Sequence, residues 1–159
     1  MTYVVIRIRG QVHLNVQVRD TMRYLRLTRA NHCVFLPQNP TSDGMLQRAK
    51  DYVTWGEVDA PVAARVLIKR ARLLGDKKID DAWVKENTKF ASVNTLAKAI
   101  TEGKATLKDV PGLKAVLRLH PPRGGFGGSK RAFRAGGSLG YRGKDINDLI
   151  LRMLGPEES

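Results

Sequence analysis

The stretch Tyr3-Val4-Val5-Ile6-Arg7-Ile8-Arg9, near the start of the chain, decides the fold of the first segment. Val4, Ile6 and Ile8 point to one face of an extended chain, and the residues between them point to the other. This period of two predicts a β-strand over residues 3–9, which Gly10 ends.

The apolar spacing changes after this strand from two residues to three or four, which is typical of a helix. Val18, Met22 and Leu25 stand at positions i, i+4 and i+7 and predict a helix over residues 18–28 with one apolar stripe. Three arginines repeat this spacing one position later and form a basic ridge beside the stripe: Arg19, Arg23 and Arg26.

The same reasoning extends the pattern to β-α-β-α-β over the first 59 residues and to a mostly helical remainder. The further predicted strands are 32–36, 52–58 and 113–119, and the further predicted helices are 44–51, 59–74, 80–86, 92–103 and 145–154. We therefore expect an α+β fold with a core domain over 1–59 and a C-terminal extension over 60–159.

The chain is strongly basic, with 28 lysines and arginines against 15 acidic residues in 159, a net charge of +13. Residues 1–42 hold six arginines and one acid, and residues 110–144 hold eight basic residues and no acid. Charge kept only for solubility remains an alternative. Two separated blocks of one sign nevertheless predict two contact surfaces for one large polyanion, most commonly a nucleic acid.

The segment 121–143 is rich in glycine, with eight glycines and two prolines. Such a composition buries little apolar surface and predicts a long Gly/Arg-rich loop without regular structure. The loop fits neither a mononucleotide nor a dinucleotide phosphate motif, because the glycine spacing and Ser129-Lys130 differ from both. Arginines and the aromatic Phe126, Phe133 and Tyr141 suit contact with RNA phosphates and bases, whereas a flexible tether is the alternative.

No catalytic or metal-binding constellation emerges from the sequence. His13, His32 and His120 are far apart, and the single Cys33 lies in a predicted strand beside His32, where neighbouring side chains point to opposite faces. The lone cysteine also fits a reducing compartment, and no apolar run approaches the roughly 20 residues of a membrane span. We expect no enzymatic activity, no cofactor, no metal, no small-molecule substrate and no membrane contact.

Several short motifs resemble one known family. They are Asn31-His32-Cys33, Gly44-Met45, Tyr52 to Glu57, Leu117-Arg118-Leu119-His120-Pro121-Pro122-Arg123-Gly124-Gly125 and Gly136 to Gly143. Together they resemble the archaeal large-subunit ribosomal protein of the L-thirty family, the equivalent of the eukaryotic L-seven protein. The resemblance covers essentially the whole chain. The first strand begins at Tyr3 without the long basic extension of eukaryotic members, which favours the archaeal form.

The resemblance implies a ferredoxin-like, antiparallel three-stranded sheet with two helices on one face and a mixed C-terminal subdomain. It also implies a cytoplasmic protein of the large ribosomal subunit. The implied partners are 23S-type rRNA, 5S rRNA and neighbouring ribosomal proteins. Asp43 replaces a basic residue that relatives often carry before Gly-Met, and Arg48, one turn later, is the candidate to take its place.

The residues and the resemblance together give a set of candidate rRNA-binding side chains, in which the arginine ridge and the turn residues Gln11 and His13 face RNA backbone. The full set is Arg7, Arg9, Gln11, His13, Arg19, Arg23, Arg26, Asn31, His32, Arg48, His120, Arg123, Gly124, Gly125, Lys130, Arg131, Arg134, Tyr141, Arg142 and Lys144. A chromatin-like protein that binds duplex DNA is the alternative function, which composition alone does not separate from rRNA binding.

Overall fold

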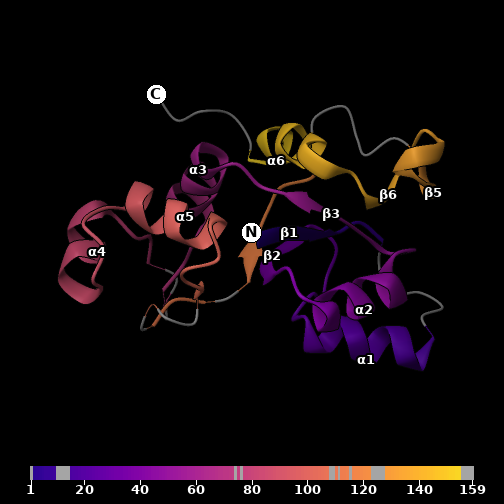
Figure 1. The fold of residues 1–159 in the computed structure, drawn as a ribbon, viewed down its shortest axis with the longest axis horizontal. Coiled ribbons are helices and arrows are strands. Elements are labelled where there is room, and N and C mark those ends of the chain that lie inside the picture. The colour runs from indigo at the N-terminus through magenta and orange to yellow at the C-terminus, as the bar shows by residue number, and fades with distance from the viewer. Residues whose placement is uncertain are drawn as a thin grey trace.

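The structure is a computed structural model that describes residues 2–9, 15–73, 75, 77–107, 110, 112–114, 116–122 and 128–154. The elements follow the chain as β1 (Thr2–Arg7), α1 (Val16–Tyr24), β2 (His32–Pro37), α2 (Pro40–Ala49), β3 (Val53–Glu57), α3 (Ala60–Arg70), α4 (Asp81–Asn87), α5 (Val93–Thr101), β4 (Leu117–Arg118), β5 (Gly128–Ala132), η2 (Phe133–Ala135), β6 (Gly137–Tyr141), η3 (Gly143–Asp145) and α6 (Ile146–Met153) (Figure 1). Within the described ranges, no helix combines the length and the apolar character that a membrane span needs.

The strand β1 lies between β2 and β3 and pairs antiparallel with both. This confirms the predicted β-α-β-α-β order of the first segment. The sheet extends further, because β4 pairs antiparallel with β2, and β6 pairs parallel with β3. Among the described residues, the order is β4-β2-β1-β3-β6, with β5 added beside β6. The prediction of a three-stranded, purely antiparallel sheet is therefore wrong, since strands from residues 117–141 join both edges.

Each face of the sheet packs against its own layer of helices. The side chain of Val5 joins Met22 of α1 and Leu46 of α2 in one cluster. Its neighbours Val4 and Ile6 join the other cluster, to which α3, α5 and α6 contribute. Figure 1 shows α1 and α2 together on one side of the strands. The side chains of residues 3–9 thus alternate between two apolar layers, one on each face of the sheet. A sheet covered on both faces buries both sets of side chains.

The helix α2 begins at Pro40, four residues before the predicted start at Gly44. The side chain of Asn39 accepts a hydrogen bond from the backbone N–H of Ser42 at 2.8 Å, and Pro40 occupies the first turn, where its missing N–H costs nothing. Residues 40–44 therefore form the first turn of α2, and Asn39 is its cap. By contrast, the helix predicted over 92–103 begins where the sequence indicates, because Ser92, a favoured N-cap residue, caps α5 with the N–H of Thr95 3.3 Å from its hydroxyl.

The Gly-rich segment forms strands and a short 3-10 helix over most of residues 128–141, which contradicts the prediction of an irregular loop over 121–143. β6 pairs with the buried strand β3 through Thr54 and Trp55, and Ser138 and Leu139 are buried. Gly136 and Gly140 have φ values of 84° and 83°, a left-handed conformation that a side chain disfavours. These two glycines thus allow the backbone conformation with which β6 runs parallel to β3, between β3 and β5. The strand predicted over 113–119 is shorter in the structure, where β4 covers only Leu117–Arg118.

Candidate nucleic-acid interface

The helix α1 carries an exposed basic surface on the side turned away from the sheet. Thr21 and Met22 of this helix are buried, so the arginines on either side of them in the sequence, Arg19 and Arg23, point to solvent. We call the exposed guanidinium-bearing residues of this helix and the turn after it the α1 surface; they are Arg19, Arg23, Arg26 and Arg29. Because Asp20 is the only acid between residues 15 and 42, this surface is strongly positive.

Arg26 holds a backbone conformation that is rare for a residue with a side chain, with φ at 65°. The N–H of Leu27 bonds to the carbonyl of Met22 at 2.9 Å, and the N–H of Arg26 bonds to that of Arg23 at 3.0 Å. This pair of bonds is the Schellman ending of a helix, in which the left-handed position is usually glycine. The predicted helix over 18–28 is therefore wrong at its end, because the chain reverses at Arg26.

A second basic surface follows the edge of the sheet along β4. One hollow of about 230 Å³ is lined by Arg70, Arg72, Lys114, Val116 and Arg118. A neighbouring hollow of about 430 Å³ shares Lys114, Val116 and Arg118, and adds Arg26 and His32. We call these two hollows the β4 groove. Within the part of the chain that the structure describes, every charged residue that lines them is basic, so the groove suits phosphate groups.

The pKa of His32 reports the electrostatic potential in the groove. Burial lowers the pKa of the His32 imidazole, and the positive charges of Arg118, Arg29 and Arg7 lower it further. Burial, the largest cause, disfavours any charge on the imidazole, whereas the contribution of the three arginines shows that the field around His32 is positive.

Two of the predicted contact residues lie inside the protein. Arg7 is 1% exposed, and its guanidinium donates to the carbonyls of Arg9 at 2.8 Å and Leu27 at 2.6 Å. Burial lowers its pKa. The prediction that Arg7 contacts RNA is not supported by this position, because its side chain ties β1 to the turn after α1.

Arg142 is the second buried arginine, with 8% of its surface exposed. Its Nε donates to the Thr54 hydroxyl at 2.8 Å and its Nη2 donates to the Ser138 carbonyl at 2.7 Å. The guanidinium carbon lies 4.7 Å from the centre of the Phe133 ring. Burial, followed by the charge of Arg152, lowers the pKa of Arg142 to about 10. This arginine joins β6 to β3 and offers no exposed charge.

The remaining predicted residues are dispersed. Arg48, His120, Arg134 and Lys144 are exposed at separate places, and Arg9 packs over the Tyr52 ring at 5.0 Å. Asn31 is half-buried in a left-handed conformation, with φ at 69°. Tyr141 donates its hydroxyl to Glu57 at 2.6 Å and lies edge-on to Tyr3. The following lie outside the described residues or have side chains that do: Gln11, His13, Arg123, Gly124, Gly125, Lys130 and Arg131.

Sequence reasoning missed several residues of the basic surfaces. Lys114 and Arg118 belong to the acid-free block 110–144, so the charge count included them, but no local pattern marked them as a groove. Arg70 and Arg72 join them only because the bridge from Leu73 to Leu113 brings the end of α3 to this edge. The exposed Tyr24 at the end of α1 was also missed, since an isolated aromatic on a helix usually reads as core. Among the described residues, no group of acidic, histidine and cysteine side chains is placed to hold a metal ion.

The protein has a mixed β-sheet covered by helices on both faces, and its surface carries two basic regions. These features define its class as a basic α+β protein suited to bind a polyanion. A family model described as ribosomal protein L30p/L7e matches residues 3–53. Three relatives named large ribosomal subunit protein uL30 match nearly the whole chain. The relative from Methanopyrus kandleri is 49% identical over 92% of this chain, that from Methanosphaera stadtmanae 47% over 96%, and that from Methanocorpusculum labreanum 44% over 95%, each with 99% of its own length covered.

The chain therefore belongs to the family of the large ribosomal subunit protein uL30. The resemblance drawn from the sequence motifs is confirmed, and so is its archaeal affinity.

Proposed function

We propose that the chain is a structural constituent of the large ribosomal subunit that binds folded rRNA through the α1 surface and the β4 groove. Membership of the uL30 family supports the ribosomal location and a structural rather than catalytic role. The observation that carries the RNA contact is the sign and exposure of the charges. Arg19 and Arg23 are exposed on α1, and Arg26 is exposed in the turn after it. Among the described residues, the charged side chains that line the groove beside them are all basic.

The physical mechanism is neutralisation of phosphate charge. Arginine guanidinium groups form paired hydrogen bonds with phosphate oxygens and release condensed counterions. Arg19 and Arg23 sit on a helix that Met22 and the C-cap residue Leu25 pack against the sheet, so their positions are set before RNA arrives. The surface therefore reads the path of an RNA backbone more than its base sequence.

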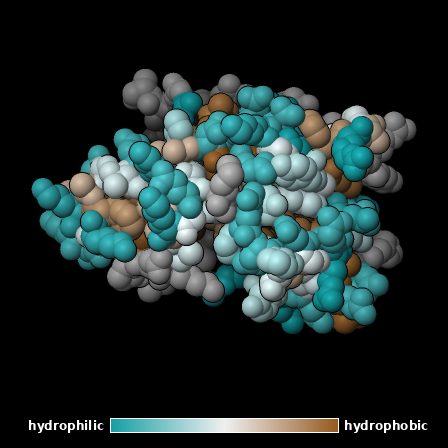
Figure 2. Space-filling view, in the orientation of Figure 1, coloured by the Kyte–Doolittle hydropathy of each residue, from teal (hydrophilic) through white to brown (hydrophobic). Residues whose placement is uncertain are grey.

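The partners that we propose are 23S-type rRNA and, in addition, 5S rRNA. Neighbouring ribosomal proteins are expected around the rest of the surface, as for any protein of the subunit. Figure 2 shows one face of the molecule on which hydrophilic residues predominate and hydrophobic residues emerge only in small patches. Such a face suits wet, charged contacts with nucleic acid.

The experiment compares two double variants that remove the same charge. Arg19→Ala with Arg23→Ala removes two cations from the α1 surface, and Lys85→Ala with Lys98→Ala removes two exposed cations from α4 and α5. Binding to a transcribed 23S-type rRNA is measured over a range of salt concentrations. We expect the arginine pair to reduce the log–log salt slope by about 1.5 to 2 and the lysine pair to leave it unchanged.

Equal effects of the two pairs would show that only net charge matters and would contradict the proposal. A 5S rRNA transcript and a duplex DNA of the same length serve as parallel ligands. Equal or stronger binding to the duplex DNA would favour a chromatin-like protein instead.

A further inference from the structure

We propose that the hollow at the open edge of β2 is a binding site for one unpaired RNA base, stacked against Tyr24 and tied to the β4 groove by Arg26. The proposal rests on the proposed function and adds a site to it. The hollow measures about 440 Å³ and lies beyond the short pairing of β4, which covers only His32 and Cys33 of β2.

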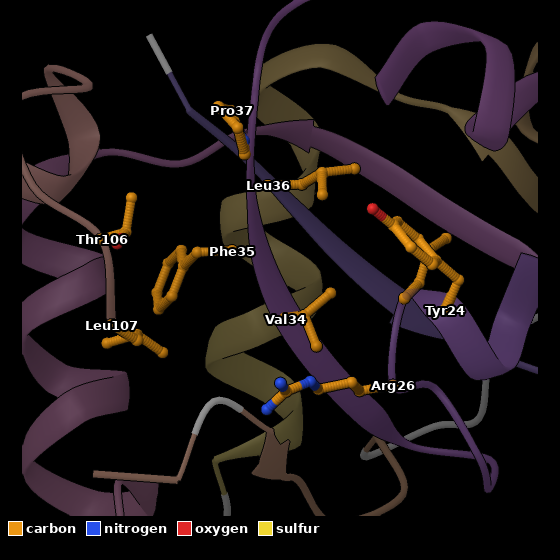
Figure 3. A pocket seen from close by; sticks show the side chains of 9 residues that line it. Tyr24, Arg26, Val34, Phe35, Leu36, Pro37, Thr106 and Leu107 are labelled. Carbon is orange, nitrogen blue, oxygen red and sulfur yellow. The ribbon is translucent and has the colours of Figure 1, made fainter. Parts of the chain in front are cut away.

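Most of the residues that line the hollow are apolar or aromatic, on both sides of β2, and Arg26 and Thr106 are the polar ones besides the Tyr24 hydroxyl. Figure 3 shows Tyr24 and Leu36 on one side of the strand and Phe35 with Leu107 on the other. A flat ring with polar edges fits such a place, since its faces contact apolar side chains and its edges remain near water and the backbone. Nucleobases have this shape, and proteins that bind unpaired nucleotides stack them on aromatic side chains.

Tyr24 is the exposed aromatic at this site, with 75% of its surface open to solvent. It ends α1, directly among the arginines of the α1 surface. A large exposed ring adds nothing to the core of the isolated protein. Its exposure is explained if a ligand covers the ring, and base stacking is the contact that an exposed tyrosine offers to RNA.

Arg26 connects the hollow to the β4 groove, because it lines both. Figure 3 shows its side chain extending past Val34 towards Leu107. The left-handed conformation at this position suits glycine, and yet an arginine occupies it. Strained residues of this kind cluster at functional sites, where the strained backbone aims a side chain. A base in the hollow would thus have its phosphate next to Arg26 and the following phosphates along Lys114 and Arg118.

An extended segment of another protein is the competing occupant, since β2 has an open edge. The charge of the adjoining groove favours RNA. Among the described residues, no acidic side chain lines the hollow or the groove, and a row of cations continues from one to the other: Arg26, Lys114, Arg118, Arg70 and Arg72. Pro37 ends the edge and lacks a backbone N–H, which shortens any strand that could add there.

The test separates the base from the phosphates. The probes are an oligoadenylate of about ten nucleotides and an abasic ribose-phosphate chain of the same length. We expect the protein to bind the oligoadenylate about tenfold more tightly than the abasic chain, from stacking of one base. Tyr24→Ala should abolish this preference and leave binding to the abasic chain unchanged, whereas Tyr24→Phe, which keeps the ring, should retain it.

Two further variants complete the design. Arg118→Ala should weaken binding to both probes, and Ile68→Ala, which removes an exposed apolar side chain on α3, should weaken neither. Equal affinity for the two probes, or an unchanged preference in Tyr24→Ala, would overturn the base site while leaving the proposed function intact. Failure of both probes to bind in a salt-dependent way would count against the proposed function itself.

The assembled subunit provides a second readout. In large subunits reconstituted with this chain, ultraviolet cross-linking followed by mass spectrometry should give a nucleotide adduct on the peptide that contains Tyr24. A cross-link from that peptide to another protein, with no nucleotide adduct, would show that a protein segment fills the hollow and would overturn the proposal.

Discussion

The segments 15–31 and 128–145 are both basic, but Arg142 of the second segment has the opposite environment to the arginines on α1 in the first. In the first segment, Arg19 and Arg23 stand exposed on α1 because the helix buries its other side. In the second, Arg142 is buried between Thr54, Ser138 and Phe133 and holds a strand to the sheet. The number of arginines in a segment therefore does not predict how many of them are exposed. An arginine that can donate to backbone carbonyls and pack on an aromatic ring can be buried and stabilise the fold.

The largest effect is expected from Gly56→Ala in β3, where this strand packs against Gly143 of the second segment. A Cβ at Gly56 would lie 2.0 Å from the carbonyl oxygen of Gly143, and neither backbone can yield easily. We expect a loss of about 3 kcal/mol or more in the free energy of unfolding, measured by denaturant titration. Gly44→Ala is the matched control, since nothing lies within 4 Å of its Cβ in α2. It should raise stability by about 0.5 kcal/mol or more. Equal stability of the two variants would mean that β3 and η3 do not pack this closely.

Arg142→Met tests whether the buried arginine is structural. The substitution leaves the Thr54 hydroxyl and the Ser138 carbonyl without their donor, so the free energy of unfolding should fall by about 2 kcal/mol. The salt slope of rRNA binding should not change. Arg134→Met, at an exposed position, should alter stability by less than about 0.5 kcal/mol. A reduced salt slope for Arg142→Met would place its charge on the RNA and erase the contrast between the two segments.

Arg26→Gly should separate stability from binding within the first segment. Glycine relieves the left-handed strain but adds freedom to the unfolded chain, so the free energy of unfolding should stay within about 1 kcal/mol of the original. Binding to rRNA should weaken, because a cation shared by two hollows is lost. Arg29→Gly removes the same charge without relieving strain and should be the less stable of the two. A lower free energy of unfolding for Arg26→Gly than for Arg29→Gly would contradict the left-handed strain that we assign to Arg26 at the end of α1.

The smallest effect concerns Tyr141. Its hydrogen bond to Glu57, with burial and the Glu57 charge, raises the pKa of Tyr141 to about 12. A phenol whose pKa is raised by folding contributes stability below its unfolded pKa near 10, and this contribution is lost as the pH rises to about 12. An ultraviolet titration of tyrosinate, compared with Tyr141→Phe, should assign one ionisation near pH 12. In Glu57→Gln this ionisation should move towards 10, and an unmoved ionisation would exclude the Glu57 contact as its cause.

The sequence predicted those parts of the fold whose signals are local. The alternation in residues 3–9, the stripe on α1 and the Ser92 cap each act within a few residues, and each led to the correct element. β6 was missed because Gly-Ser-Leu-Gly-Tyr reads as a turn, and its pairing partner Thr54 lies far away in the chain. No local pattern reveals such a partner.

The candidate site was predicted in part for the same reason. Arg19 and Arg23 of the predicted ridge follow from helical spacing and are exposed on α1, whereas Arg26 is exposed in the turn after the helix. The period of two assigned Arg7 to a face but gave no sign that a layer of helices covers that face. The β4 groove joins the end of α3 to residues 114–118, and only the folded chain brings these cations together.

The most direct measurement is the reactivity of individual arginines towards phenylglyoxal, read by mass spectrometry, in the free protein and in its complex with a transcribed 23S-type rRNA. We predict that Arg19, Arg23 and Arg26 react in the free protein and are protected in the complex, while Arg7 and Arg142 stay unreactive in both. Equal modification of Arg19, Arg23 and Arg26 in the two states would contradict the account.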